Sequence, residues 1–207
     1  LLLILLITCI LFSVSSAFAS DVNDTAIASD ESDIDTLEVI SNDENPVLTE
    51  ETQDSSDDGT YTALQKKITL AGDGSTINLT RDYQYNDDFK LTTGVFINKD
   101  ITINGNGHTI DGMGKSRIFN INYGDGLKLY KVTLNNITFK NGNAKIYGGA
   151  ILNFADLTID NCYFTNNNAG TAGGAVNSLG SLTLKNSKFT KNSAGGDAGA
   201  VFSLTYS

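Results

Sequence analysis

The sequence predicts an all-β fold, a parallel β-solenoid with about 25 residues in each coil. From about residue 130, six columns of like residues recur at intervals of 25 positions through three copies. Each copy holds short runs that alternate apolar and polar residues, such as 157–159, with Asn or Gly turns between them. No run has a sustained helical stripe, and the unit is shorter than the ~40 residues of a propeller blade. Short strands that pair in parallel from coil to coil fit this pattern.

Like side chains lie above one another in such a solenoid. We expect an aromatic stack in the interior, formed by Phe139, Phe164 and Phe189. We also expect an amide ladder at a tight turn, because Asn tolerates the left-handed backbone of such corners. Its members are Asn136, Asn161 and Asn186. The residues after this corner should point inward, which predicts that Cys162 is a buried small residue and not a reactive thiol. They are Ile137, Cys162 and Ser187.

The chain before this repeat is expected to hold a cap and looser coils. Residues 63–70 are predicted to form a short amphipathic helix that covers the first open strand edge, with Leu64 and Ile68 on one face. A strand at 76–79 follows, and further strand-like runs lie at 94–98, 101–105, 108–112 and 118–121. Residues 76–207 would then make about five coils, a stack roughly 25 Å long.

The first 60 residues are expected to lie outside the solenoid. We interpret residues 1–19 as a secretory signal peptide, an apolar run that ends in Ala17-Phe18-Ala19. An uncleaved membrane anchor is the alternative, and lipid attachment at Cys9 is disfavoured. Residues 20–60 are predicted to form a disordered acidic spacer, since residues 21–60 hold 14 acidic residues and no Lys or Arg.

Residues 61–207 are assigned to the β-helix domain. The chain has a net charge of −10, but this domain holds all 14 basic residues and the remaining 10 of 24 acidic ones, a net +4. Removal of the signal peptide would leave Cys162 as the one cysteine, so no internal disulfide is expected. Because the chain starts without Met and stops inside the repeat, we expect truncation at both ends.

The repeats resemble those of polymorphic outer-membrane proteins. Residues 148–151 and 173–176 match the GGA[ILV] motif of that family, and residues 164–167 and 189–192 match its FxxN motif. This resemblance implies that the β-helix is right-handed. It implies the architecture more strongly than the function, because solenoids carry many functions.

The wider arrangement is similar to adhesin-like surface proteins of methanogenic archaea. The resemblance rests on the signal sequence, the acidic spacer, the strand 76–79 and the segment 103–112. The opening cap resembles that of the pectate-lyase-like superfamily. Two positions depart from the motifs, Gly142 where FxxN has Asn and Ala198 where the GGA motif has its first Gly. Both are expected to be turns, so the fold should be retained.

No catalytic, cofactor-binding or metal-binding constellation is predicted. Glycoside hydrolysis needs paired carboxylates, and lyases of this fold use calcium-binding carboxylates with a basic residue. The candidate carboxylates form no column from coil to coil; they are Asp111, Asp125, Asp156, Asp160 and Asp197. With one His and two Cys, the chain has few of the ligands that a Cys/His zinc site requires. The acidic balance argues against binding nucleic acid.

Three further residues could carry chemistry. His108 could act as a general acid or base, but its Gly-bounded setting favours a structural turn in which Asp111 holds the backbone. Lys115 and Arg117 could bind an acidic sugar, although isolated basic residues usually lie at the surface and contribute to solubility. Glycosylation sequons begin at Asn23, Asn78 and Asn136. Asn136 is expected to be inaccessible because it belongs to the predicted amide ladder.

These observations together predict a secreted or cell-surface, adhesin-like β-helix. It would be a stiff, non-catalytic scaffold without a cofactor, and its partners would be glycans or other cell surfaces. One alternative is a polysaccharide lyase or glycoside hydrolase whose active site lies on further coils. A second alternative is a structural envelope component without a ligand.

Overall fold

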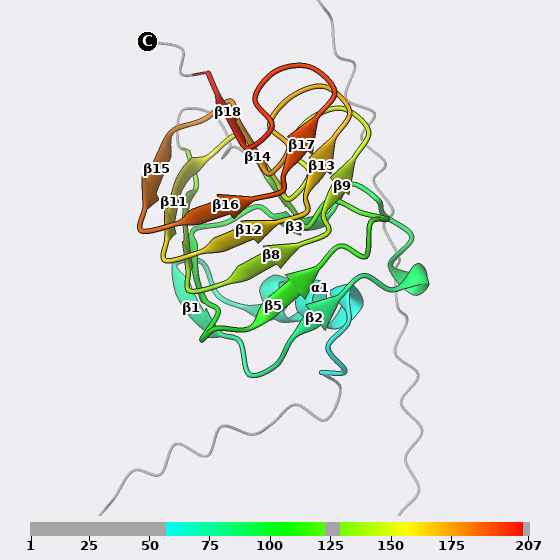
Figure 1. Cartoon of the computed structure of the whole chain (residues 1–207). Coiled ribbons are helices and arrows are strands. Elements are labelled where there is room, and N and C mark those ends of the chain that lie inside the picture. The colour runs from blue at the N-terminus through cyan, green and yellow to red at the C-terminus, as the bar shows by residue number, and fades with distance from the viewer. Residues whose placement is uncertain (1–56, 123–128, 205–207) are drawn as a thin grey trace, which may run out of the picture. The chain divides into compact units, whose positions relative to one another are not determined.

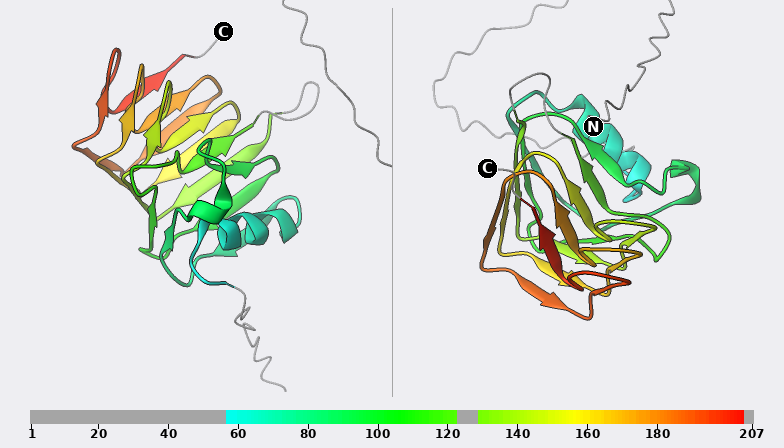
Figure 2. Two further views of the ribbon diagram at one scale, coloured as in Figure 1. Left: turned by 90° about the vertical axis from the view of Figure 1, so that its right-hand side faces the viewer. Right: turned by 90° about the horizontal axis from the view of Figure 1, so that it is seen from above.

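The chain winds into a parallel β-solenoid of five coils, as predicted. The structure is a computed structural model that describes residues 57–122 and 129–204. Every strand pairs in parallel with its counterparts on the neighbouring coils. Figure 2 shows the coils side by side, with the later coils progressively farther from the helix.

Three five-stranded sheets and one shorter sheet form the sides of the solenoid. Sheet 1 joins β1 (Ser75–Asn78), β4 (Ile101–Asn104), β7 (Lys131–Asn135), β11 (Asp156–Asp160) and β15 (Leu182–Lys185). Sheet 2 joins β2 (Tyr83–Gln84), β5 (Thr109–Asp111), β8 (Thr138–Lys140), β12 (Tyr163–Thr165) and β16 (Lys188–Thr190). Sheet 3 joins β3 (Val95–Ile97), β6 (Phe119–Ile121), β10 (Ile151–Asn153), β14 (Val176–Ser178) and β18 (Val201–Ser203). Sheet 4 joins β9 (Asn143–Ala144), β13 (Asn168–Ala169) and β17 (Ser193–Ala194).

The α-helix α1 (Tyr61–Leu70) covers the first coil, where the sequence predicts a cap at 63–70, and the short 3-10 helix η1 (Asp87–Phe89) packs beside it. Helix α1 begins at Thr60, whose hydroxyl accepts a hydrogen bond from the N–H of Ala63 at 3.1 Å. Its apolar side, which includes Leu64 and Ile68, is buried in the core. The amide of Gln65 pairs with both backbone groups of Phe96 in β3, at 2.7 and 3.2 Å. Gln65 therefore occupies hydrogen-bonding groups that an open strand edge would expose.

The predicted phenylalanine stack fills the interior behind sheet 2. Phe139 pairs in register with Phe164, and Phe164 with Phe189. The ring centroids lie 4.7 Å apart in both pairs, with interplanar angles of 14° and 5°. In the coil before them, Ile110 occupies the same column. The phenylalanine column therefore extends through the three coils that have the regular 25-residue spacing.

The predicted asparagine corner is present, but its amides do not form one continuous ladder. Asn136, Asn161 and Asn186 have positive φ angles of 50°, 51° and 47°. Asn161 Nδ2 donates to Asn136 Oδ1 at 3.4 Å, whereas Asn186 Nδ2 turns to Asp160 Oδ1 at 2.9 Å. The carboxylate is the stronger acceptor. The prediction that Asn136 is inaccessible is wrong, because its side chain is exposed at this left-handed corner.

The inward direction after this corner is confirmed for Ile137 and Cys162, which are both buried. Ser187 on the last coil is half-buried, and its hydroxyl accepts a hydrogen bond from the N–H of Cys162 at 3.1 Å. Cys162 is therefore a packed core residue. Its thiol approaches the carbonyl oxygen of Leu134 at 3.5 Å and that of Asp160 at 3.3 Å.

A second amide ladder, inside the solenoid, is formed by the Asn of the FxxN motif. Asn167 is fully buried, and its side chain bonds the N–H of Gly142 at 2.7 Å and the carbonyl of Phe139 at 3.1 Å. Asn192 repeats these contacts one coil later, at 3.0 Å to the N–H of Asn167 and 3.1 Å to Phe164. Gly142 is buried as well, and an added Cβ would lie 2.8 Å from Asn167 Oδ1. The motif therefore supplies internal hydrogen bonds between coils and not just turns.

Replacing the buried amide should be costly. Asn167→Ala strands buried donors and acceptors on two neighbouring coils, so we expect a loss of about 2–4 kcal/mol in the free energy of unfolding, from roughly 1–3 kcal/mol for each stranded group. The matched control is Asn168→Ala, whose exposed amide bonds Asn143 at 3.3 Å. This control should lose no more than about 1 kcal/mol. Chemical denaturation measures both, and equal losses would contradict the assignment.

Candidate functional site

Residues on the first three strands of sheet 2 line a polar cleft. Sheet 2 faces the viewer in Figure 1. The cleft has a volume of about 460 Å³. Strands β2, β5 and β8 supply its floor, and the segment before α1 supplies one wall. Its charged lining residues are Asp58, Arg81, Asp82, Asp111 and Lys140.

Asp111 lies at the centre of a hydrogen-bonded group in this cleft. Its Oδ1 accepts from the N–H of Met113 at 2.7 Å and from Asn141 Nδ2 at 3.0 Å. Lys140, its register partner on β8, places Nζ 3.3 Å from Oδ2. The expectation that Asp111 holds a turn is confirmed by the bond to Met113. The bonds to Asn141 and Lys140 also join two coils, so this carboxylate is fixed in position.

His108 lies beside the cleft with a carboxylate partner that the sequence did not reveal. Its Nδ1 is 3.1 Å from Asp82 Oδ1, and this oxygen also accepts from the N–H of Thr109 at 2.9 Å. The bond from Thr109, together with the charge and hydrogen bond of His108, lowers the pKa of Asp82. If Nδ1 carries the proton, Nε2 is left as a proton acceptor. The pair is therefore capable of general acid–base chemistry, on a side chain that is 31% exposed.

The wall of the cleft is tied down by Asp57. Tyr83 donates its hydroxyl proton to Asp57 Oδ2 at 2.6 Å, and Lys67 of α1 lies 3.0 Å from the same oxygen. Burial acts to raise the pKa of Asp57, but these two partners outweigh it and lower the pKa overall. Burial and the Asp57 carboxylate raise the pKa of Tyr83. This ion-paired group anchors residues 57–60, so the cleft has a fixed wall.

Farther along sheet 2, an aromatic ring and hydroxyl groups continue the outer face. Tyr163 on β12 directs its hydroxyl to Thr190 Oγ1 at 2.6 Å, and Thr190 bonds Thr165 at 3.3 Å. Lys188 Nζ lies 5.8 Å from the centroid of the Tyr163 ring, a cation–π contact. A second hollow of about 440 Å³ lies at the edge of the sheet. Its lining includes Asn141, Asn143, Asn166 and Asn168.

The other predicted carboxylates do not join this site. Asp156 and Asp160 begin and end β11 on sheet 1, where Asp156 pairs with Lys131 as the repeat predicts. Asp197 is exposed in the segment between β17 and β18. Asp125 lies outside the described residues. Lys115 is exposed and pairs with Asp87 at 3.1 Å, as expected for a surface residue.

Arg117 is not the surface residue that the sequence suggests. It is buried, and its guanidinium donates to the carbonyl oxygens of Gly148, Thr93 and Tyr147 at 3.0, 3.0 and 2.8 Å. Burial lowers its pKa to about 10. The reason for the burial is that carbonyl groups of neighbouring coils converge where no strand pairs them. Arg117 satisfies them with its planar set of donors.

Asp58, Arg81, Asp82 and Lys140 are cleft residues that sequence reasoning missed. In sheet 2 the spacing between equivalent residues is 27 and then 29 in the first coils, against 25 later. Columns could not be aligned there without the structure. The repeat could not place Lys140 beside Asp111, because their separation of 29 residues departs from the 25-residue spacing.

The described residues hold no group of three His, Cys, Asp or Glu side chains placed to bind a metal ion. In the same residues, no helix has the length and apolar character needed to cross a membrane.

Comparison with known proteins agrees with the fold. Residues 72–169 match the model of a family described as a "Putative pectate lyase-like adhesive domain". This match runs from before β1 to the end of β13 and includes Arg81, Asp82, Asp111 and Lys140. Neither the curated proteins nor the solved structures yielded a match.

Cys162 should be unreactive in the folded chain. Burial raises the pKa of its thiol to about 11, so at pH 8 the thiolate is a very small fraction of the total. We expect alkylation by iodoacetamide at least about 100-fold slower than for the unfolded chain. Mass spectrometry of native and denaturant-treated protein measures both rates. Comparable rates would show that the core opens around Cys162.

Proposed function

We propose that this protein is an exported or cell-surface adhesin-like β-helix that binds carbohydrate on the outer face of sheet 2 without transforming it. The observation that carries the proposal is the cleft whose polar groups are fixed by contacts between coils. The match to an adhesive-domain family supports an adhesive role and a surface location. In this proposal the right-handed β-helix, cleaved signal peptide and acidic spacer predicted from the sequence would export and present the domain.

The proposed mechanism is binding by a preorganised surface. Asp111 and Lys140 hold each other at 3.3 Å, so little side-chain entropy is lost when they bind sugar hydroxyl groups. Tyr163 offers an aromatic ring held by its hydroxyl bond to Thr190. Because the strands of sheet 2 are parallel and in register, these groups form an ordered row along the solenoid. An extended polysaccharide would contact several coils at once.

Binding should depend on this row. On an array of polysaccharides, the purified chain should bind at least one class, and Asp111→Asn or Tyr163→Ala should each weaken its binding by about tenfold or more. The control is Thr133→Ala, on the outer face of sheet 1, which should leave binding unchanged. Absence of all binding by a folded chain, or equal weakening by the control, would contradict the proposal.

A second candidate function is carbohydrate cleavage, which the contact between His108 and Asp82 favours. Incubation with polygalacturonate, with and without calcium, should release no new chain ends if the protein only binds. If it is an enzyme, His108→Ala should lower the rate by about 100-fold or more, the usual contribution of a general acid or base. Asp156→Asn on sheet 1 is the control. Cleavage that persists in the His108→Ala variant would argue against His108 as the catalytic group.

A further inference from the structure

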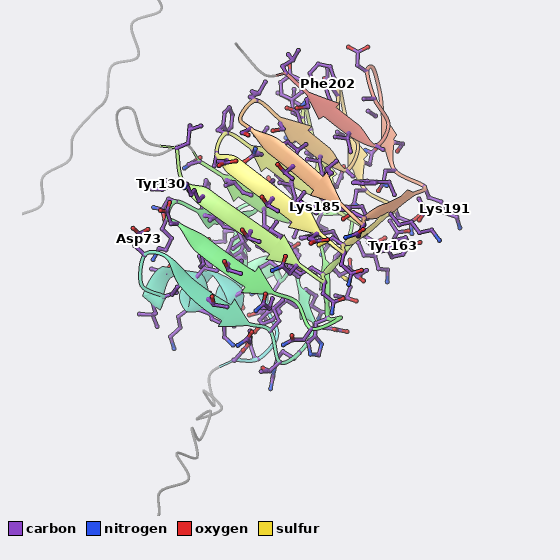
Figure 3. All side chains as sticks on the ribbon, turned by 90° about the vertical axis from the view of Figure 1, so that its left-hand side faces the viewer. Asp73, Tyr130, Tyr163, Lys185, Lys191 and Phe202 are labelled. Carbon is purple, nitrogen blue, oxygen red and sulfur yellow. The ribbon has the colours of Figure 1, made fainter. Side chains whose placement is uncertain are left out.

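The corner where sheet 1 turns into sheet 2 carries amide groups that bond from one coil to the next. Asn104 Nδ2 donates to Asn78 Oδ1 and Asn135 Nδ2 donates to Asn104 Oδ1, both at 3.0 Å. Asn161 Nδ2 donates to Asn136 Oδ1 at 3.4 Å. In each bond the later coil provides the N–H group and the earlier coil provides the oxygen. Figure 3 shows the end of sheet 1 that leads into this corner, near the labelled Lys185 and Tyr163.

Asn78 and Asn136 are the first members of these two rows. Each accepts a hydrogen bond through Oδ1. Within residues 57–122 and 129–204, no hydrogen bond uses the Nδ2 of either residue. Both side chains are exposed. Their later partners differ, because the Nδ2 groups of Asn104, Asn135 and Asn161 are all engaged as donors.

The same two residues begin the Asn-x-Thr sequons of the described chain, Asn78-Leu79-Thr80 and Asn136-Ile137-Thr138. The middle residue is buried in both, which anchors the backbone. Thr80 is exposed, and Thr138 is half-buried on the outer side of β8. No hydrogen bond between described residues holds either hydroxyl. The acceptor nitrogen and the threonine hydroxyl of each sequon are therefore both available.

We propose that Asn78 and Asn136 are acceptor sites for N-linked glycosylation of the folded chain. In the cell this rests on the export proposed above. The co-reactant is an oligosaccharide carried on a polyprenyl phosphate or diphosphate. Nδ2 attacks the anomeric carbon, a C–N bond forms, and the C–O bond to phosphate breaks. The lipid phosphate leaves with the electron pair of that bond, and Nδ2 loses one proton, so nothing is oxidised or reduced.

The test is a transfer reaction on the complete, folded, unmodified chain. The chain is incubated with a purified oligosaccharyltransferase and its lipid-linked oligosaccharide, and peptide mass spectrometry then locates the glycans. A short sequon peptide in the same reaction is the positive control. We expect glycans at Asn78 and Asn136. Thr80→Val and Thr138→Val should each abolish one of them, and Thr138→Ser should retain its site.

A matched control tests whether glycosylation requires an amide nitrogen without a hydrogen bond or only an exposed Asn side chain. Lys188→Thr creates a third sequon at Asn186, which is exposed at the same corner but donates its Nδ2 to Asp160 at 2.9 Å. We expect occupancy at Asn186 to be at least about tenfold lower than at Asn136, because a hydrogen bond to a carboxylate must first break. If the peptide is modified while Asn78 and Asn136 stay bare, or if Asn186 is occupied as fully as Asn136, the proposal is overturned. Neither result depends on export or carbohydrate binding. The proposal of an exported, carbohydrate-binding protein is therefore tested separately.

Discussion

Coil-to-coil register is the constraint on which the rest of this structure depends. Parallel pairing places each residue directly beside its counterpart on the next coil. Each side chain must therefore pack against, or hydrogen-bond to, the side chain at the equivalent position of that coil. Phenylalanine satisfies this condition by ring stacking at 4.7 Å. Asparagine satisfies it by acting as donor on one side and acceptor on the other, as Asn167 does inside the solenoid. The regular repeat is the consequence of that condition.

The candidate site lies where the register is least regular. Strands β2 and β5 lie 27 and 29 residues before their register partners, and four residues join sheet 1 to sheet 2 in the first two coils, against two in the later coils. These insertions bring unlike charges into register, such as Asp111 and Lys140. The regular coils also pair unlike charges, as Asp156 does with Lys131. The longer corner at 79–82 adds Arg81 and Asp82 to the cleft.

Buried polar groups in the irregular coils need partners that no column can supply. Arg117 fulfils this role by bonding three carbonyl groups from two other segments of the chain. Arg117 resembles the buried Asn167 in one respect, because both side chains donate to backbone carbonyl oxygens. The difference is that Arg117 has no counterpart one coil away, so its burial depends on this one arrangement of loops.

The sequence by itself determined the solenoid, its 25-residue coils, the phenylalanine column, the left-handed Asn corners and the buried position of Cys162, because each follows from a strict spacing between like residues. The tertiary structure alone decided which unlike residues meet: the contact between His108 and Asp82, the wall built by Asp57, the burial of Arg117 and the exposure of Asn136. Those contacts depend on where loops of unequal length return to the stack and on which way each corner turns its side chain. Neither the loop lengths nor the side-chain directions at the corners repeat at a fixed spacing, so the repeat alone could not predict them.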